Sequence, residues 1–303
     1  MTSTSDAPGR VFHYTNRAGL IGILNSQTLW ATAAEFLNDD QEIRYAVGLI
    51  AAQLKNSATP ARYDLPMLDL VDRFIAEMWR QFPAHEPFEL LRESEPYLVS
   101  FCRSGDLLSM WRAYGADGGF AIEFDTAQLL AACSPLGEAE WDSLDGEAGD
   151  PLLESRMRNS GLSASAHAVS YGSGALQGLA DSILGRIAER YHDIRDLAAE
   201  VVTISIKDLL EIKHPAFREE EEVRLIVFEE GDLAPPRSLR ELRHHLGVYQ
   251  VVHFPLDAIR SVTVGPGPYS ARNRLALHRA FATDPAGRFN NVELRVSGAP
   301  LIA

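Results

Sequence analysis

Four consecutive glutamates at 219–222 run directly into an apolar stretch at 223–228. Alternate residues of a strand share a face, so Glu220 and Glu222 are expected to point the same way at the rim of a core strand. Crowding and partial burial there would raise a carboxyl pKa, as acid–base or electrostatic catalysis requires. The competing interpretation is a solvated strand entrance with a Glu222–Arg224 ion pair.

A second group of polar side chains lies in "FHYT", where His13, Tyr14 and Thr15 end a predicted strand just before a helix. A single histidine is more often a satisfied core residue than a catalytic one. The motif therefore gives a candidate site only in combination with others.

The third group is "SMWRAYG", which places Trp111, Arg112 and Tyr114 on about one helical turn and its exit. Two aromatic rings beside a guanidinium can stack on a planar ring and hold a phosphate. Core packing explains the aromatic residues equally well, and Arg112 less well.

The elements that would position these groups follow from hydrophobic periodicity. Strands are predicted at 11–15, 28–32, 97–102, 118–125, 223–228, 247–256, 259–265 and 291–296, and helices at 16–26, near 42–54, from Pro66, near 107–114, within 175–212 and at 270–283. Asn16 is the expected N-cap of the first helix, which has Leu20, Ile23 and Leu24 on one face, and the second helix has Ile43, Val47, Ile50 and Leu54 on one stripe. Residues 134–165 have little periodicity and are expected to form a long surface excursion or a mobile flap. Strands scattered among helices without a βαβ rhythm favour an α+β fold.

Composition limits the possible functions. The 303-residue chain carries a net charge of −14, which disfavours broad attraction to nucleic acid but leaves a local arginine-lined groove possible. The two cysteines are too few for a disulfide framework, and we find neither an apolar run long enough to span a membrane nor a secretory signal. We expect a cytoplasmic protein with reduced thiols.

Other patterns carry little chemistry. There is no HExxH, CxxC or GxSxG motif, and the histidines lack metal-ligand spacing, so we predict neither a metal site nor a serine hydrolase. The run Asn38–Asp39–Asp40 is most simply a turn and a helix cap.

Several blocks together resemble a known bacterial family. "FHYTNRAGLIGILNSQTLWATAAEFLNDDQE", "YLVSFCRSGDLLSMWRAYGADGGFAIEFD", "VSYG" and "HPAFREEEEVRLIV" are similar to the domain-of-unknown-function family 2971, over about residues 11–265. This resemblance identifies a family without identifying a reaction.

A more distant resemblance, to the ADP-ribosyltransferase superfamily, supplies chemistry. "FHYTNRAGLIGILNSQTL" looks like the opening of those enzymes, "SFCRSGDLLSMWRAY" is similar in layout to the segment whose tyrosine stacks on nicotinamide, and "EEEEVRLIV" looks like the late strand that carries their glutamate. Trp111 stands where one branch has serine, and His13 stands where the arginine-modifying branch has its leading arginine.

This second resemblance implies a split, mixed or antiparallel sheet in one ADP-ribosyltransferase-like domain, residues 10–300, with helical insertions near 40–90 and 126–212. It also implies NAD as the substrate. The implied roles are transition-state stabilisation by Glu222, orientation or deprotonation of the acceptor by Glu220, ribose binding by His13 with Thr15, nicotinamide stacking by Tyr114, and pyrophosphate binding by Arg112; Tyr14 and Trp111 complete the expected NAD-binding set.

The expected function is therefore NAD-dependent ADP-ribosyl transfer or NAD hydrolysis, suited to a toxin or an antiphage defence effector. The acceptor stays open among nucleic acids, nucleotides and proteins, as does a neutralising or regulatory partner. Two alternatives remain: a non-enzymatic binding module on the same fold, and a hydrolase with Glu220 and Glu222 as its acid–base pair. We rank the hydrolase last, since glycosidase carboxylates flank the scissile bond.

Overall fold

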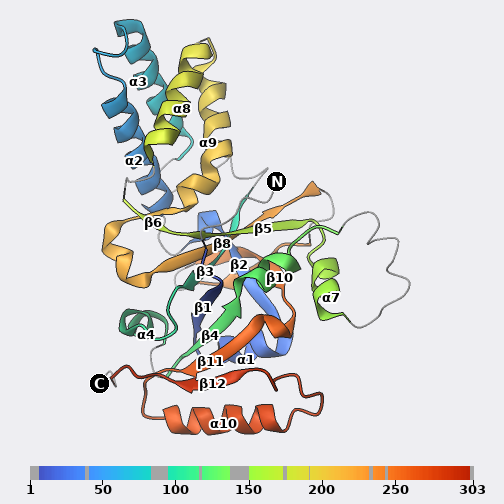
Figure 1. Ribbon diagram of the computed structural model, residues 1–303. Coiled ribbons are helices and arrows are strands. Elements are labelled where there is room, and N and C mark those ends of the chain that lie inside the picture. The colour runs from blue at the N-terminus through green and yellow to red at the C-terminus, as the bar shows by residue number, and fades with distance from the viewer. Residues whose placement is uncertain are drawn as a thin grey trace. The chain divides into compact units, whose positions relative to one another are not determined.

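The chain forms a large sheet with flanking helices and a separate group of helices (Figure 1). This computed structural model describes residues 7–37, 41–82, 95–115, 118–136, 150–172, 176–190, 192–231, 235–242 and 245–300. It divides the chain into two compact units. The sheet unit consists of Met1–Ala33, Tyr97–Ala168 and Glu219–Ala303, and the helical unit of Ala34–Pro96 and Val169–Arg218.

The main sheet has ten strands within the described residues. They are β1 (Arg10–Thr15), β2 (Thr28–Ala33), β3 (Tyr97–Cys102), β4 (Phe120–Asp125), β5 (Leu162–Ala168), β8 (Glu222–Glu229), β9 (Ser238–Glu241), β10 (Leu246–His253), β11 (Ile259–Val264) and β12 (Glu293–Val296). The path β12-β11-β4-β1-β3-β2-β10-β9 is antiparallel except for the pair β11–β12, and β8 joins β3 to β5. The predicted α+β class is confirmed.

Strand β3 is shared among three partners. β8 pairs with all six of its residues and so occupies one whole edge. On the other edge, β1 meets β3 at Cys102, while β2 meets it at Tyr97 and Leu98. No described strand pairs with residues 99–101 on that edge, so β1 and β2 diverge there. We call this gap the split.

Five α-helices accompany the sheet in the described part of its unit: α1 (Arg17–Ser26), α4 (Leu108–Tyr114), α5 (Thr126–Ala132), α7 (Pro151–Arg158) and α10 (Ser270–Ala282). Asn16 caps α1 by accepting a hydrogen bond from the Gly19 amide at 2.9 Å, in agreement with the sequence. Leu20, Ile23 and Leu24 are buried, as the apolar stripe predicts.

The helical unit contains α2 (Gln41–Ser57), α3 (Leu65–Arg80), α8 (Leu176–Glu189) and α9 (Ile194–Leu210), which pack against one another (Figure 1). The short strands β6 (Ser170–Tyr171) and β7 (Ile212–Lys213) form a second, parallel sheet. The predicted stripe of α2 is buried at Ile43, Val47, Ile50 and Leu54. The predicted cap at 38–40 lies outside the described residues.

The expected excursion at 134–165 is wrong in its second half. Residues 151–158 form α7, and β5 begins at Leu162 and pairs with β8 along its whole length. Small side chains in "LSASAHA" fit a covered strand but produce no apolar alternation, so periodicity could not detect it. Residues 137–149 lie outside the described part.

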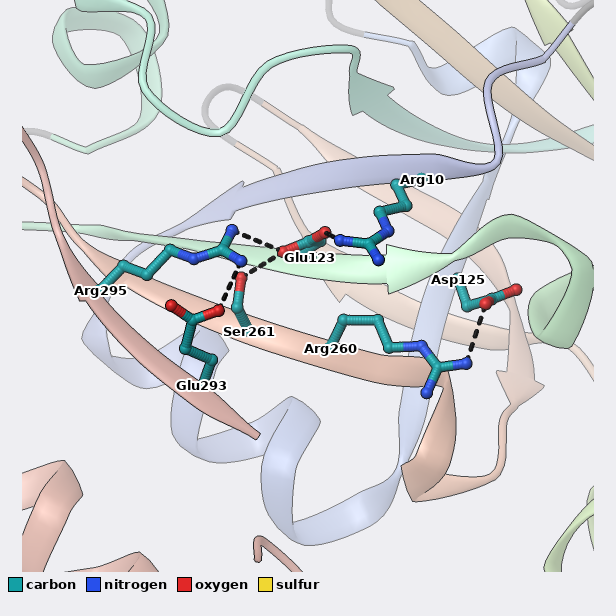
Figure 2. Close-up of polar contacts among 7 residues, drawn as sticks. All are labelled: Arg10, Glu123, Asp125, Arg260, Ser261, Glu293 and Arg295. Atoms are coloured by element: carbon teal, nitrogen blue, oxygen red, sulfur yellow. Dashed lines mark hydrogen bonds and ion pairs between the residues drawn. The ribbon is translucent and has the colours of Figure 1, made fainter. Parts of the chain in front are cut away.

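A buried carboxylate fastens four strands of the sheet (Figure 2). Glu123 is 1% exposed and accepts hydrogen bonds from Arg10 and Arg295, both at 2.8 Å, and from Ser261 at 2.5 Å. These residues come from β4, β1, β12 and β11. Arg295 also pairs with the exposed Glu293 at 2.6 Å. The cluster fixes the edge strand β12 to the sheet interior.

We predict that Glu123→Gln lowers the free energy of unfolding by about 1–3 kcal/mol, because a buried amide cannot satisfy two guanidinium groups and a hydroxyl. Glu293→Gln is the matched control and should have a much smaller effect, since Glu293 is 61% exposed. Urea unfolding measures both changes. Equal changes in the two variants would contradict a fastening role for Glu123.

Candidate functional site

The glutamate run does not lie on one strand. β8 begins at Glu222, Glu220 ends the 3-10 helix η3 (Pro215–Glu220), and Glu221 between them has a φ of 45°. The expectation that Glu220 and Glu222 share a strand face is therefore wrong, because the backbone turns at Glu221. A non-glycine residue with positive φ is uncommon and costs strain. The arrangement also lacks the paired strand carboxylates that the hydrolase alternative assumed.

Glu222 lies in a buried ion pair. Its Oε1 accepts from Arg224 Nε at 2.9 Å and from the Ser100 hydroxyl at 2.7 Å, and its Oε2 accepts from Arg224 Nη2 at 3.1 Å. The side chains of Glu222 and Arg224 are 4% and 3% exposed. The ion-pair interpretation is thus confirmed, but the pair is buried and not solvated.

Ser100 connects Glu222 to His13. The Ser100 hydroxyl donates to Glu222, and its main-chain carbonyl lies 3.1 Å from His13 Nδ1. His13 follows Phe12, which is aligned with Cys102 and so with Glu222, and its side chain therefore begins on the opposite face of the sheet. His13 and Glu222 meet through Ser100 at the split, without touching. We call His13, Ser100, Glu222 and Arg224 the split site.

The split site is open at its centre. Ser100 is exposed although it lies in an interior strand, where both of its neighbours, Val99 and Phe101, are buried. His13 is half-buried and packs edge-on against Phe101, with ring centroids 5.8 Å apart. A ligand approaching the split would therefore meet the Ser100 hydroxyl.

The protonation state of His13 follows from its neighbours. A carbonyl oxygen only accepts, so Nδ1 must carry the hydrogen that bonds Ser100. Burial lowers the pKa of His13, the Ser100 carbonyl opposes that shift, and the positive charge of Arg240 adds to it. The neutral ring with Nδ1 protonated leaves Nε2 as a hydrogen-bond acceptor.

Tyr14 and Trp111 belong to the core between β1 and α4. Their rings meet edge-on at 4.7 Å, and Trp111 is 1% exposed. The Tyr14 hydroxyl donates to the Ser104 carbonyl at 3.0 Å and accepts from the Leu107 amide at 2.9 Å, while Trp111 Nε1 donates to Asp106 at 2.7 Å. Burial raises the pKa of Tyr14. With these contacts, neither ring is open to a ligand unless α4 moves.

The other predicted residues remain at the surface of the same unit. Arg112 and Tyr114 lie on α4 and are exposed. Thr15 ends β1 and lies against the first turn of α1, so close to Gly19 that a β-carbon there would overlap its hydroxyl. The structure thus joins His13 to Glu222 through Ser100, while Arg112 and Tyr114 remain exposed on α4.

Two residues that sequence patterns did not single out belong to this region. Ser100 is the polar residue in "YLVSFC", and a polar residue on one face of an otherwise apolar strand was the available signal. Arg240 lies in β9, a strand that was not predicted because its four residues are too short and polar to show alternation.

The Glu222–Arg224 pair should dominate local stability. We predict that Arg224→Met lowers the free energy of unfolding by about 3–5 kcal/mol, because it leaves a buried carboxylate without its cation. The double variant Glu222→Leu/Arg224→Met should be more stable than Arg224→Met, since it removes both charges. Urea unfolding of the three proteins tests this, and a double variant less stable than Arg224→Met would contradict it.

His13 should make stability depend on pH. Its folded-state pKa is lowered from 6.5, so below that pH the unfolded chain binds a proton that the folded chain refuses. The stability that His13 contributes is complete above the unfolded pKa and is lost as the pH falls toward the folded value. Urea unfolding at about pH 8 and about pH 5 should show a smaller loss in His13→Gln than in the wild type. An equal loss of stability in His13→Gln and in the wild type would contradict this role of His13.

The chain resembles a known family over part of its length. The family model described as a protein of unknown function (DUF2971) matches residues 110–225, which run from α4 to the first half of β8. No curated protein and no solved structure matches the chain. In the described part, no group of three His, Cys, Asp or Glu side chains could hold a metal ion, and no helix is long and apolar enough to cross a membrane. Over residues 110–225 the chain is similar to the family of unknown function DUF2971.

Proposed function

We propose that the protein cleaves the nicotinamide–ribose bond of NAD at the split site and passes ADP-ribose to an acceptor or to water. The observation that carries the proposal is the bonding of Ser100 to both His13 and Glu222 across the split. The resemblance to ADP-ribosyltransferases pairs a histidine on an early strand with a glutamate on a late one. Here these residues are 209 positions apart in sequence, and one residue connects them.

Glu222 would stabilise the positive charge that develops on the ribose. As the bond breaks, its electron pair goes to the nicotinamide nitrogen, the ring leaves neutral, and the ribose becomes oxocarbenium-like. A fixed carboxylate that accepts a hydrogen bond from a ribose hydroxyl stabilises this positive charge without having to reorganise. Arg224 and Ser100 hold Glu222 in one orientation. Ser100 is exposed, so a ribose hydroxyl can replace its hydroxyl on Oε1.

The acceptor completes the reaction. Its nucleophilic atom, the oxygen of water in the hydrolytic case, forms the new bond to the ribose carbon and loses its proton to a base. Glu220 ends η3 two residues before Glu222, and we assign it to that base. Its position on a separate element lets it face an acceptor from a direction different from that of Glu222.

His13 would bind the ribose on the adenine side. A neutral imidazole with Nδ1 bound to Ser100 presents Nε2 to a hydroxyl donor, and Thr15 lies two positions along the same strand. Tyr114 and Arg112 are exposed on α4, where they would contact nicotinamide and pyrophosphate. Tyr14 and Trp111 would support this helix from the core. A split ADP-ribosyltransferase-like sheet is part of the same proposal, as is a role in toxicity or antiphage defence.

The test is nicotinamide release from NAD, followed by chromatography with purified protein. We expect the wild type to release nicotinamide and Glu222→Gln to lose at least about a hundredfold in rate, the scale of removing one electrostatic stabiliser. Glu219→Gln is the control, since Glu219 is an exposed neighbour that contacts Ser109 only through its main-chain carbonyl. Thermal unfolding checks that all three proteins are folded.

Full release by Glu222→Gln would remove Glu222 from the mechanism. If the wild type instead bound NAD in calorimetry and released no nicotinamide with nucleotide, nucleic-acid and protein acceptors present, the non-enzymatic binding module would replace the proposed enzyme.

A further inference from the structure

An exposed aromatic surface lies on the strands next to the split. Trp30 is 50% exposed, and it is the exposed residue of β2, whose other side chains are buried. Its indole stacks on the Tyr249 ring of β10, with centroids 4.6 Å apart and planes inclined by 28°. Tyr249 is 8% exposed and so fixes the indole from beneath. Exposing a large apolar ring to water is unfavourable, and such exposed apolar groups often mark a binding site.

An arginine with an unbonded, buried nitrogen lies on the strand next to this stack. Arg240 is on the neighbouring strand β9, directly opposite Gly247, which lies two residues before Tyr249 on β10. Its Nε is buried and has no hydrogen-bond partner among the described residues. Burial lowers the pKa of Arg240, and Tyr249 is the group that opposes this shift. Buried polar atoms are normally hydrogen-bonded, so the unbonded Nε of the half-buried Arg240 points to an anionic ligand.

The cation also connects the aromatic stack to the split site. The positive charge of Arg240 lowers the pKa of His13. Tyr249 is aligned with Thr32, and Thr32 with Leu98, so Tyr249, Thr32 and Leu98 lie on the face that also bears the Ser100 hydroxyl. Arg240, Tyr249 and Trp30 therefore share one face of the sheet with Ser100, while the His13 side chain begins on the other face at the split.

We propose that this surface binds a nucleotide, with its base stacked on Trp30 and its phosphate bound by Arg240. An aromatic face accepts any planar base, and a guanidinium is the preferred group for a phosphate. The assignment of this nucleotide to the adenosine half of NAD rests on the proposed function, because His13 would then bind the ribose next to it. Nucleotide binding itself does not depend on turnover.

The occupant is a small nucleotide and not a nucleic-acid strand. Binding to a strand requires several cations that follow successive phosphates. Here, among the described residues, one arginine beside the stack has an unbonded buried nitrogen, and the chain has a net charge of −14. The overall charge repels a polyanion more strongly than a mononucleotide.

The experiment is calorimetric titration of the full-length protein with AMP, adenosine and a short single-stranded oligonucleotide. We expect AMP to bind more tightly than adenosine and the oligonucleotide. Trp30→Ala should weaken AMP and adenosine at least about fivefold, which is the effect of losing one base–aromatic stack. Arg240→Gln should weaken AMP at least about tenfold and leave adenosine unchanged, because it removes only the phosphate contact.

The matched controls are Tyr269→Ala and Arg272→Gln, since these residues form an exposed aromatic–arginine pair at the start of α10 with the guanidinium 5.9 Å from the ring centroid. Both should bind AMP as the wild type does, and Trp30→Phe should retain most of the affinity. The inference would be overturned if the folded wild type did not bind AMP. It would also be overturned if Trp30→Ala and Arg240→Gln bound AMP as tightly as the wild type does. So would tighter binding of the oligonucleotide than of AMP.

The result separates two failures. AMP binding that depends on Trp30 and Arg240, in a protein that releases no nicotinamide, would retain the nucleotide surface and reject the catalytic proposal. Nicotinamide release that is insensitive to both substitutions would retain the catalytic proposal and reject the nucleotide surface.

Discussion

The unequal pairing of β3 is the constraint on which the candidate site depends. One edge of β3 is fully hydrogen-bonded to β8, while the other is divided between the ends of β1 and β2. Main-chain groups of a central strand are normally hydrogen-bonded to strands on both sides. Here the Ser100 carbonyl accepts from His13 where no described strand pairs with that edge. The split therefore supplies polar backbone and a solvent-exposed hydroxyl at the centre of the sheet, where a continuous ladder would bury both.

Charge is distributed around the split with different roles for each group. Glu123 and Glu222 are both nearly buried, but Glu123 joins strands through two arginines and a serine, whereas Glu222 takes its arginine from two positions along the same strand. The first arrangement connects distant segments and is structural. The second arrangement links only strands that β8 already pairs with, so it adds no new connection that would offset the cost of burying the charges. This difference makes Glu222 the better functional candidate.

The sequence predicted what periodicity encodes and missed what it does not. The α+β class, the cap at Asn16, the helices of the second unit and the Glu222–Arg224 pair could all be derived from spacing. The strand β5 was missed because its residues are small, and β9 because it is short and polar. The positive φ of Glu221 could not be foreseen, since glutamate seldom adopts it. Ser100 is important because its hydrogen bonds reach residues 87 and 122 positions away in sequence, which no local pattern could predict.

The four glutamates can now be separated by environment. Glu219 and Glu221 are exposed, Glu220 is half-buried at the end of η3, and only Glu222 enters the core. The backbone turns at Glu221, whose carbonyl accepts from the Arg103 amide at 3.0 Å, so that the Glu222 carboxylate points inward and the other three glutamates stay outside β8. Four like charges in sequence thus become one fixed internal charge and a negative rim. In the proposed function the internal carboxylate would act on the reacting atom, while the exposed glutamates stay in solvent.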